Sequence, residues 1–276
     1  MPQNRAYWDA MSESYSTYLE RFFLKENQAR IDHLIQSFPK NSKLNLLDVG
    51  CSSGLVAKHL VDSHSKRINV LTLVDISQNM IDLTMNRLQN PIGTPANDDH
   101  PPIQVICMPW EDFSTNYHQH VVYSFLVLHL VSDVGLCLQN VHRSLKHSGS
   151  FFFSIPTIHG SNILHLPFAP IVKKYRKTDF SVFWLGKKGL VEKYLSEAKM
   201  ELLSAENVSV PLNNLDESVK FLFNSTLELP EFADLSAGEK ESMWEEFLVV
   251  QREMETKKET FSFPLTYFHA KKTPAD

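Results

Sequence analysis

Residues 44–60, LNLLDVGCSSGLVAKHL, decide the fold of this chain. An apolar run that ends at Val49 is typical of a buried strand. Gly50 and Gly54 interrupt the run, and helical spacing of apolar residues resumes at Leu55. The stretch therefore predicts a strand, a glycine turn and a helix. Glycine lets the backbone approach a ligand closely, and the free N–H groups at the start of the helix point toward the same place.

The charge in this turn separates two classes of ligand. A dinucleotide-binding turn has the pattern G-x-G-x-x-G, whose glycines cradle a pyrophosphate. Here Asp48 precedes the first glycine, where a carboxylate repels a pyrophosphate and suits a cationic ligand. The pattern Asp48-x-Gly50-x-Ser52-x-Gly54 resembles motif I of class I S-adenosylmethionine (SAM) dependent methyltransferases, although that family usually has glycine in place of Ser52. The resemblance implies that these four residues bind SAM; an ordinary strand-to-helix turn is the alternative.

A second buried strand, residues 69–74, ends at Asp75, and Ser77 is a candidate N-cap for the helix that follows. Doubly wound sheets bind ligands at the carboxyl ends of their strands, where a carboxylate can accept hydrogen bonds from ribose hydroxyls. The position resembles methyltransferase motif II. The resemblance implies that Asp75 binds the ribose of SAM and that Ile76 contacts the adenine. A solvated aspartate at the strand end is the alternative.

A third strand, residues 103–107, is followed by the sequence MPWEDF. In the resembled family an acidic residue after this strand bonds the adenine amino group, but its expected place here is near Pro109. Two neighbours are candidate substitutes. The ring of Trp110 could pack on the adenine, and the carboxylate of Glu111 could accept the hydrogen bond. A plain core position for Trp110 is equally consistent with the sequence.

A fourth strand, residues 120–125, opens a block with a further resemblance. We expect a helix after it, capped by Ser132, and a fifth strand at residues 151–155. The block resembles the S-x-x-x-L-H … h-R-x-L-K-P-G-G stretch of methyltransferases from ubiquinone, biotin and juvenile-hormone pathways. The matching residues are Ser124, Leu128, His129, His142, Arg143, Leu145, Lys146 and Gly149. The resemblance also assigns Phe125 to the cofactor site. Leu130 stands where carboxylate-methylating relatives often have tryptophan, which weakens the case for a carboxylate substrate.

Five residues are candidates for contact with the methyl acceptor. His129 is the best placed to orient or deprotonate an acceptor, although a structural histidine at the pocket floor is an equal alternative. The resemblance to small-molecule methyltransferases implies that an N-terminal helical segment folds over the site. It also implies that Tyr15, Tyr18 and Gln28 of this segment bind the substrate. His159, from the insertion after the fifth strand, is the fifth candidate.

The resemblance implies one α/β fold, a seven-stranded and mostly parallel doubly wound sheet with a helical cap inserted near the C-terminus. Residues 1–40 are expected to form the N-terminal helical segment over the cofactor site. Residues 41–155 are expected to form the SAM-binding core. Residues 156–276 are expected to supply the acceptor-pocket insertion, the helical cap and the last strands of the same domain.

The C-terminal part contains the predicted walls of the acceptor pocket. Residues 156–187 are expected to be an irregular, aromatic-rich insertion that forms one wall. Helices are predicted at 215–224 and 236–254, the second opening with a Ser-x-x-Glu capping box. The last strand lies within 261–269, and we expect it to begin after Pro264, because proline removes a hydrogen bond from a ladder.

The composition limits the class of protein. The chain has 276 residues, 43% of them hydrophobic and 21% charged, which is typical of a soluble globular protein. A net charge of −5 argues against nucleic-acid or membrane-surface binding, and no apolar run is long enough to span a membrane. The three cysteines are interpreted as free thiols of a reducing compartment, so we expect a cytoplasmic protein. Histidines occur in close pairs, but we expect no metal site.

We therefore expect a SAM-dependent methyltransferase with a small-molecule acceptor. O-methylation of a carboxyl or hydroxyl group is the first expectation, by analogy with the resembled subgroup. One alternative is a methyltransferase fold kept as a binding or assembly module, or as a non-methylating enzyme, which Ser52 and the missing acid after the third strand favour. The other alternative is a protein methyltransferase, whose acceptor groove would have to stay open.

Overall fold

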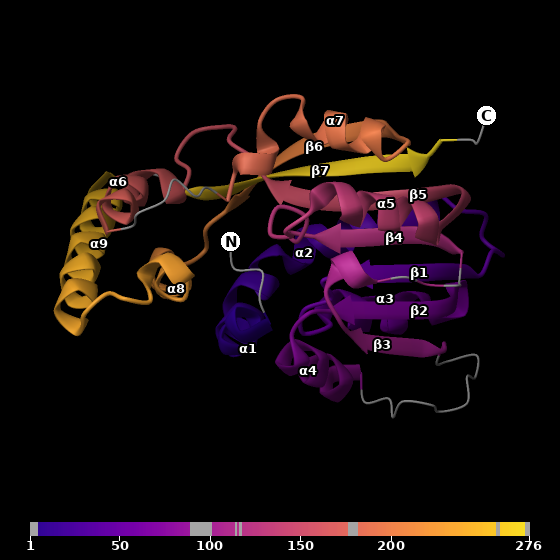
Figure 1. The fold of residues 1–276 in the computed structure, drawn as a ribbon, viewed down its shortest axis with the longest axis horizontal. Coiled ribbons are helices and arrows are strands. Elements are labelled where there is room, and N and C mark those ends of the chain that lie inside the picture. Colours follow the sequence, from indigo (N-terminus) through magenta and orange to yellow (C-terminus); the bar gives the residue numbers. More distant parts are fainter. Residues whose placement is uncertain are drawn as a thin grey trace.

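The computed structural model describes residues 5–88, 101–113, 115, 118–175, 182–257 and 260–273. Parts of the predicted N-terminal segment and of the insertion at 156–187 lie outside these ranges. In the described chain, seven strands form one sheet in the order β3-β2-β1-β4-β5-β7-β6 (Figure 1). The strands are β1 Leu44–Val49, β2 Ile68–Asp75, β3 Ile103–Cys107, β4 Gln119–Phe125, β5 Leu145–Pro156, β6 Met200–Pro211 and β7 Ser262–Lys272. The five strands β1 to β5 run parallel to one another, whereas β7 is antiparallel to its neighbours β5 and β6. This arrangement confirms the predicted fold class.

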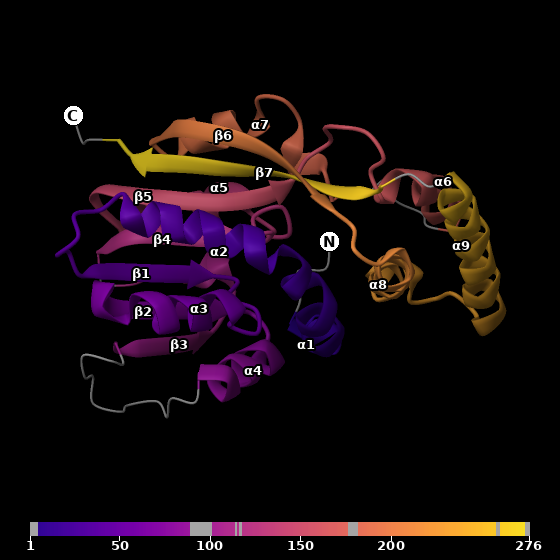
Figure 2. The same cartoon turned by 180° about the vertical axis from the view of Figure 1, so that it is seen from behind.

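Helices cover both faces of the sheet. Figures 1 and 2 show α5 and α7 on one face, and α2 and α3 on the other. The alternation of side chains along a strand explains both layers, because Leu46 of β1 packs in the cluster with α2 and α3 while Leu47 packs with α5 and α7. The helices are α1 Arg5–Ser14, α2 Glu20–Gln36, α3 Leu55–His64, α4 Gln78–Leu88, α5 Val134–Ser144, α6 His165–Tyr175, α7 Leu190–Glu197, α8 Leu215–Leu227 and α9 Ala237–Lys257.

Helices α6, α8 and α9 form a cap beyond the end of the sheet (Figure 1). They share an apolar cluster of their own, in which the rings of Phe168 and Phe247 are fully buried with their centroids 4.6 Å apart. The expectation of an irregular insertion is therefore wrong for α6. Its buried residues Phe168 and Ile171, with Leu164 just before the helix, follow helical spacing, and this apolar face outweighs Pro170 within the helix.

Two further local predictions are wrong. The last strand begins at Ser262, before Pro264, and Pro264 pairs only with β6 because the β5 pairing ends at Leu265. The missing N–H of this proline therefore removes no bond to β5. Helix α5 is capped by Asp133, whose side chain accepts a hydrogen bond from the N–H of Leu136 at 2.8 Å. The neighbouring Ser132 instead donates to Glu111.

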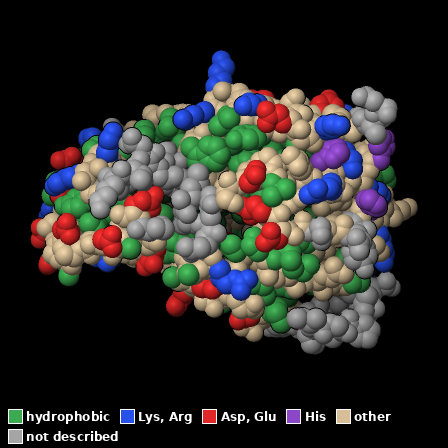
Figure 3. All heavy atoms as spheres, in the orientation of Figure 1, with side chains coloured by type: hydrophobic (Ala, Val, Ile, Leu, Met, Phe, Trp, Pro, Cys, Tyr) green, Lys and Arg blue, Asp and Glu red, His purple; other side chains and the backbone are tan. Residues whose placement is uncertain are grey.

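In the described part of the chain, no helix is long and apolar enough to cross a membrane. On the face shown in Figure 3, basic side chains are interspersed with acidic ones. This differs from the continuous basic surface typical of nucleic-acid-binding proteins.

The cap cluster gives a stability prediction. Phe247→Ala should lower the free energy of unfolding by about 3–5 kcal/mol, because it removes a fully buried ring and leaves a cavity. Urea denaturation, followed by the fluorescence of Trp244 in the same cluster, measures the change. Val249→Ala on the same helix is the matched control, since Val249 is exposed, and should change stability by less than about 0.5 kcal/mol. Equal losses for the two variants would contradict the packing described here.

Candidate active site

The turn between β1 and α3 requires glycine at two positions. Gly50 and Gly54 both have φ of +77°, in the left-handed region that side chains disfavour. A Cβ atom on Gly50 would lie 2.2 Å from Cγ2 of Val127, and one on Gly54 would lie 2.8 Å from Cγ2 of Thr84. The N–H of Gly50 donates to the carbonyl of Val74 at 2.7 Å. Packing against Val127 and Thr84 thus fixes the turn, and the hydrogen bond to Val74 holds it beside the end of β2.

The Asp75 carboxylate joins this turn to β2 and to the start of α4. Its Oδ2 accepts a hydrogen bond from the N–H of Ser52, and its Oδ1 accepts one from the N–H of Ser77, both at 2.9 Å. Burial raises the pKa of Asp75 to about 6, because the cost of desolvating the carboxylate outweighs these two bonds, and the nearby Glu20 carboxylate adds to the rise. The two sequence motifs therefore meet at one carboxylate.

A first cavity, of about 90 Å³, opens beside Asp75. Five separate segments of the chain contribute its lining. Six of the predicted cofactor residues belong to it: Gly50, Ser52, Asp75, Ile76, Trp110 and Glu111. The cavity thus combines a carboxylate at a strand end, a turn that leaves its backbone uncovered, and apolar side chains. These features fit the ribose and adenine of SAM.

The other three predicted cofactor residues lie behind this cavity and are not part of its lining. Asp48 is buried within β1, and burial raises the pKa of its carboxyl well above the usual value. Gly54 precedes α3. Phe125 packs against Phe152 and Tyr267, and its ring centroid lies 6.1 Å from the centroid of each of these two rings. In this structure these residues support the turn and the strands.

Trp110 and Glu111 each line the first cavity and also make structural contacts. The Trp110 ring is buried in the core, with its centroid 6.2 Å from that of Phe151, yet it also lines the first cavity. The Glu111 carboxylate accepts hydrogen bonds from the N–H and the hydroxyl of Ser132, at 2.8 and 2.5 Å. Partial burial raises the pKa of Glu111, but the bonds from Ser132 outweigh this effect and lower it. Glu111 therefore holds the loop before α5 as well as lining the cavity.

Helix α1 covers the first cavity. Trp8 and Tyr15 belong to the lining, and Asp9 accepts hydrogen bonds from the Ser77 hydroxyl at 2.6 Å and the Asn79 N–H at 3.2 Å. These bonds tether α1 to the start of α4. A movement of α1 away from α4 would enlarge the cavity toward the roughly 300–1,000 Å³ of typical ligand pockets.

Glu20 is a site residue that the sequence did not single out. It lies at the start of α2, and its carboxylate accepts hydrogen bonds from the Ser53 hydroxyl and, at 3.2 Å, from the N–H of Leu55. It thereby caps α3, whose own N-cap residue, Gly54, has no side chain. Burial raises the pKa of Glu20, although these bonds act in the opposite direction. Nothing local in the sequence marks a cap supplied from more than thirty residues away.

A second cavity, of about 380 Å³, adjoins the first. Trp8, Tyr15, Leu126 and Leu130 line both cavities. The walls come from the N-terminal segment, the loop after β4, and helices α6 and α8, and most of them are apolar. The apolar residues include Met11, Leu19, Phe22, Leu164, Phe168, Val172, Phe183, Phe221, Leu222 and Phe263. The cap thus forms one side of a largely apolar, partly open space next to the predicted cofactor site.

His129 belongs to the wall of the second cavity and is 5% exposed. Its Nδ1 atom is buried without a hydrogen-bond partner in the described structure. Burial lowers the pKa of His129 to about 3, because the imidazolium would be desolvated. A neutral imidazole with so low a pKa is a weak base. It is better suited to orient an acceptor through a hydrogen bond than to remove a proton.

The remaining predicted substrate residues divide into two pairs. Tyr15 and Tyr18 line the second cavity, and the Tyr18 hydroxyl is hydrogen-bonded to Ser218 of α8, which fastens the N-terminal segment to the cap. Gln28 and His159 lie outside the lining of both cavities. Gln28 is partly exposed on α2, and Nε2 of His159 bonds a β7 carbonyl at 2.9 Å. The cavity linings therefore include only the first pair.

Comparison with known proteins identifies the core. Residues 47–153 match a family model described as a methyltransferase domain. Residues 47–153 therefore form a methyltransferase domain of the SAM-dependent family that the sequence motifs predicted. A malonyl-[acyl-carrier protein] O-methyltransferase of Acetivibrio thermocellus is 27% identical over 113 residues, which are 41% of this chain and 36% of that protein. The similarity thus spans about a third of that relative.

Solved structures share the fold of this methyltransferase domain. A candidate methyltransferase from Bacillus halodurans has a TM-score of 0.58 at 15% identity, over 89% of this chain and all of that one. Phosphoethanolamine N-methyltransferase 2 of Haemonchus contortus, in complex with phosphomonomethylethanolamine and S-adenosylhomocysteine, has a TM-score of 0.57 at 14% identity. That match covers 98% of this chain and 60% of the other. At these identities the likeness concerns the fold alone.

The raised pKa of Asp75 gives a prediction about cofactor affinity. We predict that ribose hydroxyls bind the ionised carboxylate of Asp75, whose protonated fraction grows as the pH falls through about 6. The Kd of S-adenosylhomocysteine should therefore be about tenfold higher at pH 5 than at pH 7.5. Calorimetric titrations between pH 5 and pH 8 measure this dependence.

Two variants serve as controls for this pH dependence. Asp75→Asn should bind S-adenosylhomocysteine more weakly, with a Kd that no longer changes over this range. Asp82→Asn, at an exposed acid on α4, should behave like the unmodified chain. A pH-independent Kd in the unmodified chain would show that Asp75 does not hold the ribose.

Proposed function

We propose that this protein transfers the methyl group of SAM to an oxygen atom of a small acceptor with a largely apolar body. The second cavity supports the proposal, because it is mostly apolar, is partly enclosed by the cap, and shares Trp8, Tyr15, Leu126 and Leu130 with the predicted cofactor site. A partly enclosed space of about 380 Å³ suits a small molecule. The similarity to an O-methyltransferase supports oxygen as the acceptor atom.

The residues of the first cavity would hold the cofactor. When bound, SAM supplies an electrophilic methyl group whose leaving group is a neutral thioether. Asp75 offers its remaining acceptor capacity to the ribose hydroxyls, since an ionised carboxylate has about four acceptor sites and the backbone occupies two. Ile76 and Trp110 offer apolar contact for the adenine. The protein's main task is then to hold the acceptor oxygen at near-attack distance.

The charge of the second cavity favours a hydroxyl over a carboxylate as the acceptor group. A buried carboxylate needs a cationic partner, but His129 is held neutral and Lys173, also in the lining, is exposed. His129 lines this cavity, and a neutral imidazole nitrogen can instead accept a hydrogen bond from an O–H group. Because His129 is a weak base, an acidic hydroxyl such as that of a phenol or an enol requires the least help.

Turnover with a panel of acceptors tests the proposal. The full chain is incubated with SAM carrying a labelled methyl group and with matched apolar phenols, aliphatic alcohols and carboxylic acids. We expect S-adenosylhomocysteine and a labelled methyl ether, with the apolar phenols giving the highest kcat/KM. Binding of SAM without methylation of any acceptor would contradict the proposal and favour a binding module. Preference for the carboxylic acids would contradict the assignment of the hydroxyl.

Substitution of His129 tests its role once an acceptor is known. His129→Ala should lower kcat/KM for the best acceptor at least tenfold, because the acceptor loses its hydrogen-bond partner. The Kd of S-adenosylhomocysteine should stay unchanged. His147→Ala, which alters an exposed histidine of β5, is the matched control and should keep full activity. Full activity of His129→Ala would remove His129 from the acceptor site.

A further inference from the structure

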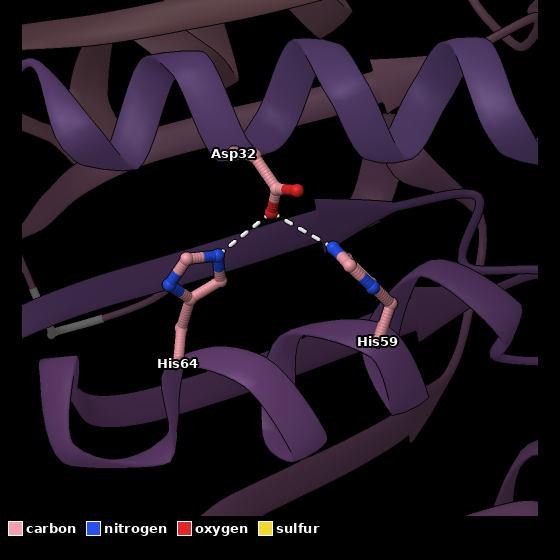
Figure 4. Close-up of side chains that lie close together, drawn as sticks. All are labelled: Asp32, His59 and His64. Carbon is pink, nitrogen blue, oxygen red and sulfur yellow. Dashed lines mark hydrogen bonds and ion pairs between the residues drawn. The ribbon is translucent and has the colours of Figure 1, made fainter.

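Three side chains gather between α2 and α3, apart from the lining of both cavities. Asp32 lies on α2, and His59 and His64 lie on α3. Figure 4 shows both imidazole rings rising from α3 toward the carboxylate of Asp32. The Nε2 atoms of His59 and His64 lie 2.8 and 2.7 Å from the same oxygen, Oδ1 of Asp32. All three potential ligand atoms lie within 4.8 Å of one another.

We infer that Asp32, His59 and His64 bind one divalent transition-metal ion. Two imidazole nitrogens and one carboxylate oxygen form a donor set that suits zinc, cobalt or nickel, whereas magnesium and calcium prefer oxygen ligands alone. A tetrahedral zinc ion held by three protein ligands keeps one position for water. The proposal does not depend on methyl transfer.

The spacing of the ligand atoms is close to that of a metal site. With zinc–ligand bonds of about 2.0–2.1 Å, tetrahedral ligand atoms lie about 3.3 Å apart. The two nitrogen–oxygen separations, 2.8 and 2.7 Å, are shorter than this value, and all three ligand atoms lie within 4.8 Å of one another. Small side-chain rotations that open the contacts with Asp32 and bring the two nitrogens together would therefore complete the site. In the same step the ion would replace the protons that the imidazoles share with Asp32.

The position of the two histidines is unusual for one helix. Residues five apart project about 140° from each other around a helix with 3.6 residues per turn. His59 and His64 nevertheless reach the same carboxylate oxygen, and His64 can do so because it is the last residue of α3. Their side chains are 19% and 15% exposed, and that of Asp32 is 31% exposed. The cluster is thus accessible to an ion while most of the surrounding water is excluded.

The charge of the cluster also suits a cation. Asp32 contributes a carboxylate, and its Oδ1 atom contacts both imidazole nitrogens. Lys58 of α3, next to His59 in the chain, is bound to Asp62 one turn further on, at 2.5 Å.

A metal ion here would join α2 to α3 at a second place. Glu20, at the start of α2, already bonds the start of α3 through Ser53 and Leu55. Asp32 lies near the other end of α2, and His64 ends α3. The metal site would therefore fix the orientation of the helix that leads into the cover of the active site.

Zinc binding by the full chain tests the inference. The chain, without an affinity tag and freed of metal with a chelator, is titrated with Zn²⁺ against a competing chromophoric chelator. We expect one tight site per chain, a rise in the melting temperature on addition of Zn²⁺, and no competition from an equal concentration of Mg²⁺. His59→Ala, His64→Ala and Asp32→Asn should each weaken zinc binding at least tenfold. His147→Ala, at an exposed histidine elsewhere, should leave binding unchanged.

A second measurement on the unmodified chain covers the case in which a variant does not fold. Zn²⁺ should protect His59 and His64, but not His147, from modification by diethyl pyrocarbonate, as read by mass spectrometry of peptides. Absence of a tight site, equal zinc binding by the three variants, or equal modification of His59 and His64 with and without Zn²⁺ would each overturn the inference.

Discussion

The active site depends on the two hydrogen bonds that the buried Asp75 carboxylate receives from the backbone. The N–H groups of Ser52 and Ser77 bring the end of β2, the glycine turn and the start of α4 to one point. Bonds from backbone N–H groups offset part of the cost of burying the charge, but not all of it, because the pKa still rises to about 6. A further hydrogen-bond donor would stabilise such a carboxylate, and our proposal assigns this role to the ribose hydroxyls of the cofactor.

Polar contacts and apolar packing both hold the segment of residues 5–20 that covers the site. Asp9 bonds the start of α4, Tyr18 bonds Ser218 of the cap, and Glu20 bonds the start of α3. Leu19 packs against the main core. Trp8 and Tyr15 line both cavities, so a movement of this segment would change the shape of both.

Local sequence patterns predicted the sheet, the turn and Asp75, because a strand period, a glycine pair and a strand-end acid depend on neighbours in the chain. The capping box at Ser236 and Glu239 forms as expected for the same reason. Contacts between distant residues could not be predicted. Glu20 caps a remote helix, α6 forms because its apolar face meets α9, and Pro264 is tolerated because β5 ends beside it. The Asp32 cluster escaped notice because its members lie on two helices, whereas the histidine pairs close in sequence do not form it.

A crystal structure of the chain with S-adenosylhomocysteine tests the central claim most directly. The account predicts that the ribose hydroxyls bond the Asp75 carboxylate and that the thioether lies between Trp8, Tyr15, Leu126 and Leu130, open to the second cavity. It also predicts that α1 lies further from α4 than in the free chain. A ligand whose ribose does not contact Asp75, or whose thioether is walled off from the second cavity, would contradict it.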